Sequence, residues 1–508
     1  MVNFGGVGQI LGDLAKAQGS HRSLPGGVFV VLPHYAFITN TERFGRFTFM
    51  WGHRRVHGEV SWLRLDNVTY LLIGPPSSDA SLWKSMDVKD IYNTRNLHAD
   101  ERDVYFSFAA SQLIRTLHEF VQYTYVHVHG ATNAPALVFL RKLNFSGQVV
   151  YTIHDYSSEP AVRYRGHVVA KFFRDNAILC PLKPSTYYFC DKHPYQNVLI
   201  SCFSRMRLKM RAYHFMLCSD HVTTVSHGIL NNLLEYNSHL EHVIVQLASE
   251  RKLSVVHNWV SADVWNLARK SISWNDPVSD KKASKRTLIQ LFDDYGHGDL
   301  SKVDVSCFIG WTGRFELNKG VHLLPHMLAA ACELRCLLVV SGFSTNVKDE
   351  GIFQRSLAKM QERGCPFLLF DHVEVQKTHF ASIRASVDIT IVPSKSEAYG
   401  LVAAEALAFA SVPVVSAVGG LQEVVKQPDK TASDDVGWTG FTFLFAHSSP
   451  ELTGGSMTNA IKLAVQKVRD TSDKFGLYRR LILSTPLVHG HDGRGGYHSY
   501  MRLYDVDM

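Results

Sequence analysis

Residues 389–425 decide the fold, and they read ITIVPSKSEAYGLVAAEALAFASVPVVSAVGGLQEVV. The β-branched start, Ile389–Val392, predicts a short buried strand that ends in a Pro-Ser turn. Gly400 then opens an alanine-rich helix, and a second strand, Val412–Ser416, leads into a second glycine turn. This order of strand, glycine turn and helix is typical of a parallel sheet covered by helices. The backbone N–H groups at such helix starts are suited to binding an anion.

Two carboxylates, Glu397 and Glu405, stand eight residues apart in this stretch. Glu397 precedes the predicted helix and Glu405 lies within it, so we expect them to contact two sets of sugar hydroxyls at different depths of one cleft. The residues alone also allow a plainer interpretation. In it, Glu397 is an acid that stabilises the start of the helix, and Glu405 is a surface residue.

Two further turns carry candidate binding groups. Gly419 and Gly420 follow the second strand and can bring backbone amides close to an anion, although paired glycines are also common in ordinary strand-to-helix turns. Arg314 and Lys319 follow another predicted strand, residues 306–311. Two cations at a strand end can neutralise a diphosphate leaving group without a metal. The alternative is a pair of surface cations.

Short apolar strands alternate with helical patterns along the whole chain. The predicted strands are residues 28–32, 68–73, 125–129, 149–154, 222–226, 254–257, 306–311, 336–341, 366–370, 389–392 and 412–416. This alternation predicts an α/β fold with two doubly wound, Rossmann-like domains and a cleft between them. Residues 266–304 are rich in Lys, Asp and Ser, and we expect them to be less structured, with the domain boundary at their start.

The first domain offers weaker signals. Gly5 and Gly6 lie in a glycine-rich loop that opens a predicted helix, residues 9–16, and such a loop can cradle a phosphate. His154 ends a predicted strand and can point into a cleft, although a lone His is more often structural. His127 and His129 alternate on one strand and so share a face, but the sequence offers no third metal ligand.

Bulk properties exclude several classes of protein. A hydrophobic fraction of 46% argues against disorder, and 508 residues are enough for two large domains. The net charge of +7 comes without a long Lys/Arg run, so it suits an anionic nucleotide better than nucleic acid. We expect no integral membrane segment, because no apolar run reaches the roughly 18 residues that a spanning helix needs. Scattered cysteines suggest free thiols and a reducing compartment.

The order of these motifs resembles bacterial glycogen synthases, plant starch synthases and the wider GT-B glycosyltransferases. The resemblance rests on the glycine-rich loop, Thr152-Ile153-His154, Gly313-Arg314 with Lys319-Gly320, Glu397 with Glu405, and Gly419-Gly420-Leu421. Weaker similarities lie in residues 99–107, 224–226, 257–266 and 497–504. It implies a GT-B fold: an acceptor-side domain (1–265), a nucleotide-sugar-binding domain (266–490) and a C-terminal helix (491–508) that returns to the first domain.

The resemblance also implies a reaction. Glucose would pass from ADP-glucose or UDP-glucose to the non-reducing end of an α-1,4-glucan, with retention and without a cofactor or metal. Domain closure would exclude water, and the leaving phosphate would accept the proton of the acceptor. The implied catalytic residues are Arg314, Lys319, Glu397 and His154. The implied donor-binding residues are Gly5, Gly6, Asn258, Gly400, Leu401, Glu405, Gly419, Gly420 and Leu421.

Some positions depart from the family pattern. Asn3 stands where the family has Lys, and Gly130 replaces an acid in the family's His-Asp-Trp segment. These departures leave two alternatives open: a GT-B transferase with a small or lipid acceptor, and a catalytically weak glucan-binding homologue. The family's first strand would precede Met1, so the sequence is expected to be a fragment or to fill that place with another segment. The expected location is the cytoplasm, or a plastid if a transit peptide precedes this start.

Overall fold

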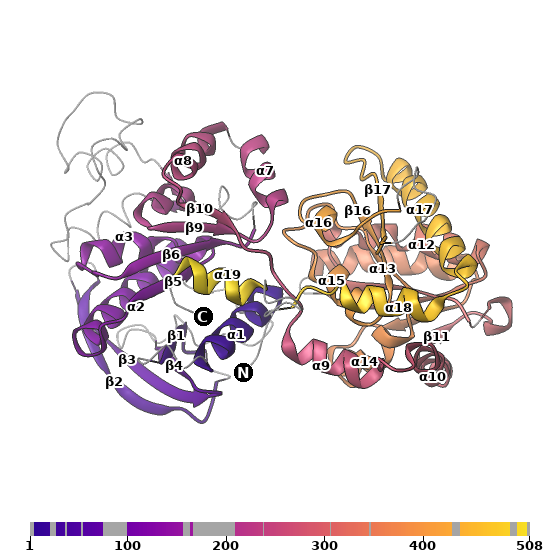
Figure 1. The fold of residues 1–508 in the computed structure, drawn as a ribbon, viewed down its shortest axis with the longest axis horizontal. Helices are drawn as coiled ribbons and strands as arrows, with labels where there is room; N and C mark the ends of the chain where they lie inside the picture. Colours follow the sequence, from indigo (N-terminus) through magenta and orange to yellow (C-terminus); the bar gives the residue numbers. More distant parts are fainter. Residues whose placement is uncertain are drawn as a thin grey trace. The chain divides into compact units, whose positions relative to one another are not determined.

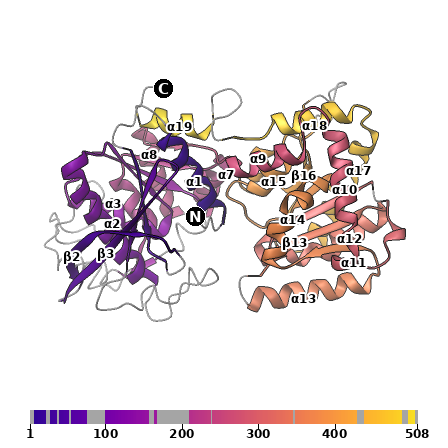
Figure 2. The same cartoon turned by 90° about the horizontal axis from the view of Figure 1, so that it is seen from below.

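The computed structural model describes residues 5–20, 27–35, 38–51, 54–74, 99–155, 163–165, 209–236, 238–304, 306–344, 347–428, 437–487 and 495–504. The chain forms two compact units. Unit 1 comprises Met1–Val225, Leu230–Val256 and Tyr497–Met508, and unit 2 comprises Ser226–Ile229 and His257–Gly496. Figures 1 and 2 show the helices and strands of each unit in two views.

Unit 2 is built around a seven-stranded sheet with the order β11-β14-β13-β12-β15-β16-β17. The strands are β11 (Gly296–His297), β12 (Phe308–Arg314), β13 (Leu337–Phe343), β14 (Phe367–Phe370), β15 (Ile389–Val392), β16 (Val412–Ser416) and β17 (Phe441–Phe443). All neighbouring strands are parallel except β11, which pairs antiparallel with β14. The central strands are buried on both faces, as their near-continuous apolar runs predict.

Two groups of helices pack on this sheet (Figure 1). One group contains α12 (Leu324–Glu333), α13 (Val347–Glu362) and α17 (Pro450–Asp470). The other contains α9 (Ala262–Ser271), α10 (Pro277–Ile289), α14 (Val373–Ser386), α15 (Leu401–Ala408) and α18 (Lys474–Leu483). Two short helices, α11 (Phe292–Tyr295) and α16 (Leu421–Val424), complete the unit. Helices on both faces of a mostly parallel sheet make unit 2 a doubly wound domain.

The strand order of unit 2 reverses between β12 and β15. From β12 the chain moves outward through β13 and β14, then returns to β15 on the other side of β12 and continues to β16 and β17. In doubly wound sheets the loops at the carboxyl ends diverge at such a switch point and leave a crevice for ligands. We therefore expect a ligand site at the loops that follow β12 and β15.

The described residues of unit 1 form two four-stranded sheets and a small two-stranded one. The first sheet has the order β1-β4-β3-β2 and the second β10-β9-β6-β5. Their strands are β1 (Val28–Pro33), β2 (Glu42–Trp51), β3 (Arg54–Leu65), β4 (Val68–Ile73), β5 (Tyr125–His129), β6 (Gln148–Ile153), β9 (His221–Thr224) and β10 (Leu253–Val255), and β7 (Arg163–Arg165) pairs with β8 (Lys209–Arg211). The second sheet is entirely parallel, whereas β2 and β3 form an antiparallel ribbon that the sequence did not predict.

The helices of unit 1 include both ends of the described chain. They are α1 (Gly5–Gly19), α2 (Ala99–Val121), α3 (Pro135–Lys142), α7 (His227–Tyr236, whose first three residues belong to unit 2), α8 (Ser238–Ser249) and α19 (Gly496–Leu503). After α19, Tyr504 packs its ring on Tyr125 of β5 at 4.8 Å. From α19 itself, the Tyr500 hydroxyl lies 3.2 Å from Oγ1 of Thr152 in β6. The C-terminal segment is thus fixed to the parallel sheet of unit 1.

The expectation that residues 266–304 are less structured is wrong. Residues 262–295 form α9, α10 and α11, and Asp276 begins α10 by accepting a hydrogen bond from the backbone N–H of Ser279. Lys281 is buried because its ammonium donates to three backbone carbonyls, those of Ala385, Val387 and Phe409. A lysine-rich segment can therefore pack as a helix when the fold supplies acceptors for its charges.

The prediction of free thiols also fails for four cysteines. Cys307 is bonded to Cys336, and Cys332 to Cys365. All four lie where β12, β13 and β14 begin or where α12 ends, at the end of the sheet opposite the switch-point loops. The parallel arrangement brings these strand starts together, so cysteines about 30 residues apart in sequence meet there.

Within the part of the chain that is described, no helix is long and apolar enough to span a bilayer.

Candidate functional site

An ion pair links the two loops at the switch point of unit 2. Lys319, on the loop after β12, places Nζ 2.6 Å from Oε2 of Glu397, on the loop after β15. The Ser394 hydroxyl donates to the same carboxylate oxygen at 2.9 Å. Both charged side chains are about one-fifth exposed, so a ligand can reach them while water is partly excluded. The sequence places these residues 78 positions apart, and the fold makes them neighbours.

Several polar contacts hold the two loops in register. The Asn318 side chain donates to the backbone carbonyl of Ser396 and accepts from the Ser396 hydroxyl. The backbone N–H of Lys395 donates to the Asn318 carbonyl, and the Trp311 indole N–H donates to that of Lys319. The Lys319 ammonium and the Glu397 carboxylate are therefore positioned by bonds on both sides rather than by their own attraction alone.

The glycines next to this ion pair are required by close packing. Gly400 has φ +104°, and a Cβ there would lie 2.5 Å from Cδ2 of Leu421. Gly420 lies against the segment before α15, because its N–H donates to the Glu397 carbonyl at 3.1 Å and a Cβ would lie 2.4 Å from the Ala398 oxygen. The structure thus brings Gly400, the N-terminal turn of α15 that Leu401 opens, and the 419–421 turn together beside Glu397.

Arg314 and Glu405 have partners outside this ion pair. Arg314 ends β12 half exposed, with its guanidinium 2.7 Å from Oε1 of Glu316. Glu405 is 8% exposed inside α15, and its Oε2 accepts from Arg384 of α14 at 2.8 Å. Burial raises the pKa of Glu405, and the Arg384 guanidinium opposes that rise. The alternative that Glu405 is a surface residue is therefore wrong. Its present contacts are those of a buried pair between two helices.

The first-domain candidate His154 belongs to a cluster of three histidines in unit 1. Nε2 of His154 lies 3.1 Å from Nδ1 of His129, whose ring lies 3.8 Å from that of His127 between centroids. Burial lowers the pKa of His127 to about 3 and that of His154 to about 4, so both are neutral at pH 7. Among the described residues, the buried Nδ1 of His154 has no hydrogen-bond partner.

The remaining predicted residues belong to both units. Gly5 and Gly6 are already helical, since α1 begins at Gly5, so the predicted glycine loop does not extend to them. Asn3 lies outside the described residues. Asn258 is buried in unit 2, between β10 and α9. His127, whose ring nitrogens contact the Tyr504 and Thr152 hydroxyls at 2.6 Å each, is not placed to bind a metal with His129.

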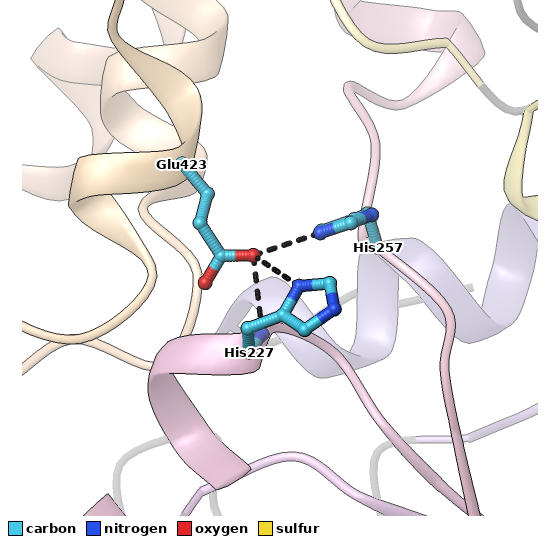
Figure 3. Close-up of side chains that lie close together, drawn as sticks. All are labelled: His227, His257 and Glu423. Carbon is cyan, nitrogen blue, oxygen red and sulfur yellow. Dashed lines mark hydrogen bonds and ion pairs between the residues drawn. The ribbon is translucent and has the colours of Figure 1, made fainter. Parts of the chain in front are cut away.

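Sequence reasoning missed Glu423, a residue with several contacts in unit 2. Its carboxylate accepts from the ring and backbone of His227 and from the His257 ring (Figure 3), and it also accepts from the Gly228 backbone. Burial alone would raise the pKa of Glu423, but the hydrogen bonds from His257, Gly228 and His227 lower it to about 2. These residues come from three separate segments, so no local spacing could have predicted the group.

Comparisons with known proteins agree with this architecture. A model of the starch synthase catalytic domain matches residues 1–246, and one of glycosyl transferases group 1 matches residues 301–437. Glycogen synthase of Streptococcus agalactiae serotype III is 23% identical over 92% of this chain and 90% of its own length. Glycogen synthases of Alkaliphilus metalliredigens and Hydrogenovibrio crunogenus, both 27% identical, are matched over 56% and 46% of their own lengths. For these two the chain spans about half of the relative.

Solved structures support the fold. The catalytic domain of starch synthase IV from Arabidopsis thaliana, bound to ADP and acarbose, superposes with a TM-score of 0.72 at 19% identity. That match covers 99% of this chain and 95% of the other. Sucrose-phosphate synthase from Thermosynechococcus elongatus gives 0.55 at 13% identity. The predicted α/β fold with two Rossmann-like domains is confirmed, and so is the predicted resemblance. Over most of its length the chain is similar to GT-B glycosyltransferases of the glycogen and starch synthase kind.

Proposed function

We propose that this chain transfers glucose from ADP-glucose or UDP-glucose to the non-reducing end of an α-1,4-glucan, with retention at the sugar carbon. The observation that carries the proposal is the Lys319–Glu397 ion pair, which joins the two switch-point loops beside the glycine turns. The names of the matched relatives supply the acceptor class, since they are glycogen synthases. The names of these relatives do not specify the base of the nucleotide in the donor.

Each residue near the pair has a role in this proposal. Lys319, with Arg314, stabilises the negative charge that develops on the departing diphosphate, because fixed cations stabilise such charge best where water is excluded. Glu397 holds hydroxyls of the transferred sugar. The amides of Gly400 and Leu401 hold phosphate or sugar oxygens, the 419–421 turn touches the donor phosphate or sugar, and Asn258 also contacts the donor. No metal is needed for this step, since two cations already balance the diphosphate.

His154 and Glu405 also have roles in this proposal. We propose that neutral His154 offers its free Nδ1 or its backbone carbonyl to the donor glucose as a hydrogen-bonding group, not as a cation. Glu405 would have to leave Arg384, or share it, to bind the ribose.

The deciding experiment supplies radiolabelled ADP-glucose and UDP-glucose, each with glycogen, with glucose 6-phosphate or with no acceptor. A glucan synthase releases diphosphate and forms labelled polymer only with glycogen. Transfer of label only to glucose 6-phosphate would show that the acceptor is a small sugar phosphate and not a glucan. Tight nucleotide binding without release of diphosphate in any arm would indicate a catalytically weak homologue.

A further inference from the structure

Three side chains from separate segments of unit 2 converge on one point (Figure 3). Glu423 lies in α16, His227 is the first residue of α7, and His257 precedes α9. Oε2 of Glu423 is 3.1 Å from Nδ1 of His227 and 2.8 Å from Nε2 of His257. One potential ligand atom from each residue lies within 4.8 Å of the other two. This is the only such group of three metal-binding side chains in the described part of the chain.

The residue types match a known class of metal ligands. Two imidazoles and one carboxylate bind Zn²⁺ in open sites whose fourth position holds water. With bond lengths of about 2.0–2.2 Å, a tetrahedral ion separates neighbouring ligand atoms by roughly 3.3–3.5 Å. The two carboxylate-to-imidazole distances are shorter than this by about 0.2–0.7 Å, so side-chain rotations that separate the ligand atoms by this amount would admit an ion.

The carboxylate is also positioned by bonds that do not involve the imidazoles. Oε1 of Glu423 accepts from the Gly228 backbone N–H at 2.7 Å, and Oε2 accepts from that of His227 at 3.1 Å. Outer hydrogen bonds of this sort orient the ligands of metal sites and increase affinity. The imidazoles of His227 and His257 are 63% and 46% exposed, so an ion can enter from solvent and keep a water ligand.

We propose that His227, His257 and Glu423 form a site for a divalent transition metal of the Zn²⁺ class. The site shares no side chain with the Lys319–Glu397 pair. Glu423 stands two residues after Leu421, at the end of the 419–421 turn, and a Cβ on Gly228 would overlap the backbone of Gly419. A bound ion would therefore hold this turn against the start of α7 and reduce its freedom to move.

The test is metal binding by the full chain after removal of metals with a chelator. Zn²⁺ is titrated by calorimetry, and Co²⁺ by its visible absorption, which is intense only for tetrahedral coordination. We expect one ion per chain. His257→Ala and His227→Ala should each weaken binding at least about tenfold, since each removes one of three protein ligands. The matched control is His372→Ala, because His372 is an exposed histidine that lies near one carboxylate, that of Asp371.

The variants are chosen to preserve the fold. His257→Ala leaves the backbone contacts of Glu423 intact, so circular dichroism should show a folded protein. Absence of stoichiometric binding by the wild-type chain would overturn the proposal and leave Glu423 as a cap for α7. Equal affinity in wild type and His257→Ala would overturn it too. Both readouts are independent of transferase activity, so failure of the proposed function would not affect them.

Discussion

The ammonium nitrogen of Lys319 lies 2.6 Å from Oε2 of Glu397, and the two residues come from loops on either side of the switch point. In the proposed reaction a donor shares both groups: its diphosphate attracts the cation and its hydroxyls the carboxylate. The ion pair thus keeps each side chain in place before the donor arrives. Such preorganisation is the main source of electrostatic stabilisation in enzymes.

Replacing Glu397 should damage catalysis without unfolding the protein. Glu397→Gln keeps the shape but weakens the contacts to Lys319 and Ser394. We expect kcat to fall roughly 10²-fold, the usual cost of losing one preorganised group. Steady-state rates with both donors check this, with Glu374→Gln as a control because that acid is exposed on α14. An unchanged kcat in Glu397→Gln would show that the Glu397 carboxylate has no role in catalysis.

Gly400 should tolerate no side chain. Gly400→Ala meets a positive φ and a Leu421 methyl at 2.5 Å, so the free energy of unfolding should fall by about 1–3 kcal/mol. The control is Gly455→Ala, which lies in α17 with open space around it and should gain about 0.5–1 kcal/mol from better helix propensity. Denaturant unfolding measures both. Equal effects of the two substitutions would contradict the packing argument.

The Glu405–Arg384 pair should contribute to stability. Glu405→Leu leaves the Arg384 charge buried without its partner, which costs about 3–5 kcal/mol. Adding Arg384→Met should restore most of this loss, because an apolar pair of similar volume avoids the uncompensated charge. Calorimetry separates the variants. If the double variant is as stable as wild type yet binds nucleotide much more weakly, Glu405 is a ribose ligand after all.

The histidine cluster of unit 1 should make stability sensitive to acid. His127 and His154 have folded-state pKa values of about 3 and 4, below the ordinary value of 6.5, so the unfolded chain binds more protons. The stability that depends on these two neutral histidines is fully present above pH 6.5. It is lost as the pH falls through the folded-state pKa values of about 4 and about 3. Each such histidine adds up to about 1.4 kcal/mol per pH unit to the slope.

Unfolding free energies measured between pH 7 and pH 4 test this. The wild type should lose stability steeply, and His154→Gln should have a shallower slope. The exposed His372→Gln serves as the control and should follow the wild type. Parallel curves for His154→Gln and wild type would mean that His154 is protonated equally in both states.

Local patterns predicted much of the fold. The bounds of β4, β5, β15 and β16 agree with those expected from short apolar runs, because buried parallel strands have a strong local signature. The ribbon of β2 and β3 was missed, since Glu42–Trp51 mixes charged residues with apolar ones on a half-exposed strand. For α10, the Asp276-Pro277 start was a usable signal, but the buried lysines of this helix concealed its apolar face.

The site was predicted in part for a similar reason. Lys319, Glu397, Gly400 and the 419–421 turn follow strands that lie side by side, so topology alone places them together. Other contacts could not be predicted from spacing in the sequence. Glu405 pairs with Arg384 of another helix, and the histidines around Glu423 come from other segments. Gly130 has φ +77° and ψ 156°, a conformation that only glycine adopts readily, so the backbone itself disfavours the family's acid there.

The most direct test of the proposed transferase is the turnover of Lys319→Ala with labelled ADP-glucose or UDP-glucose and glycogen. We expect wild type to form labelled polymer with one diphosphate released per glucose. Lys319→Ala, folded and still able to bind glycogen, should turn over about 10²–10³-fold more slowly. Lys377→Ala, which changes an exposed lysine on α14, should match wild type. Wild-type turnover by Lys319→Ala would show that this ammonium does not stabilise the departing diphosphate.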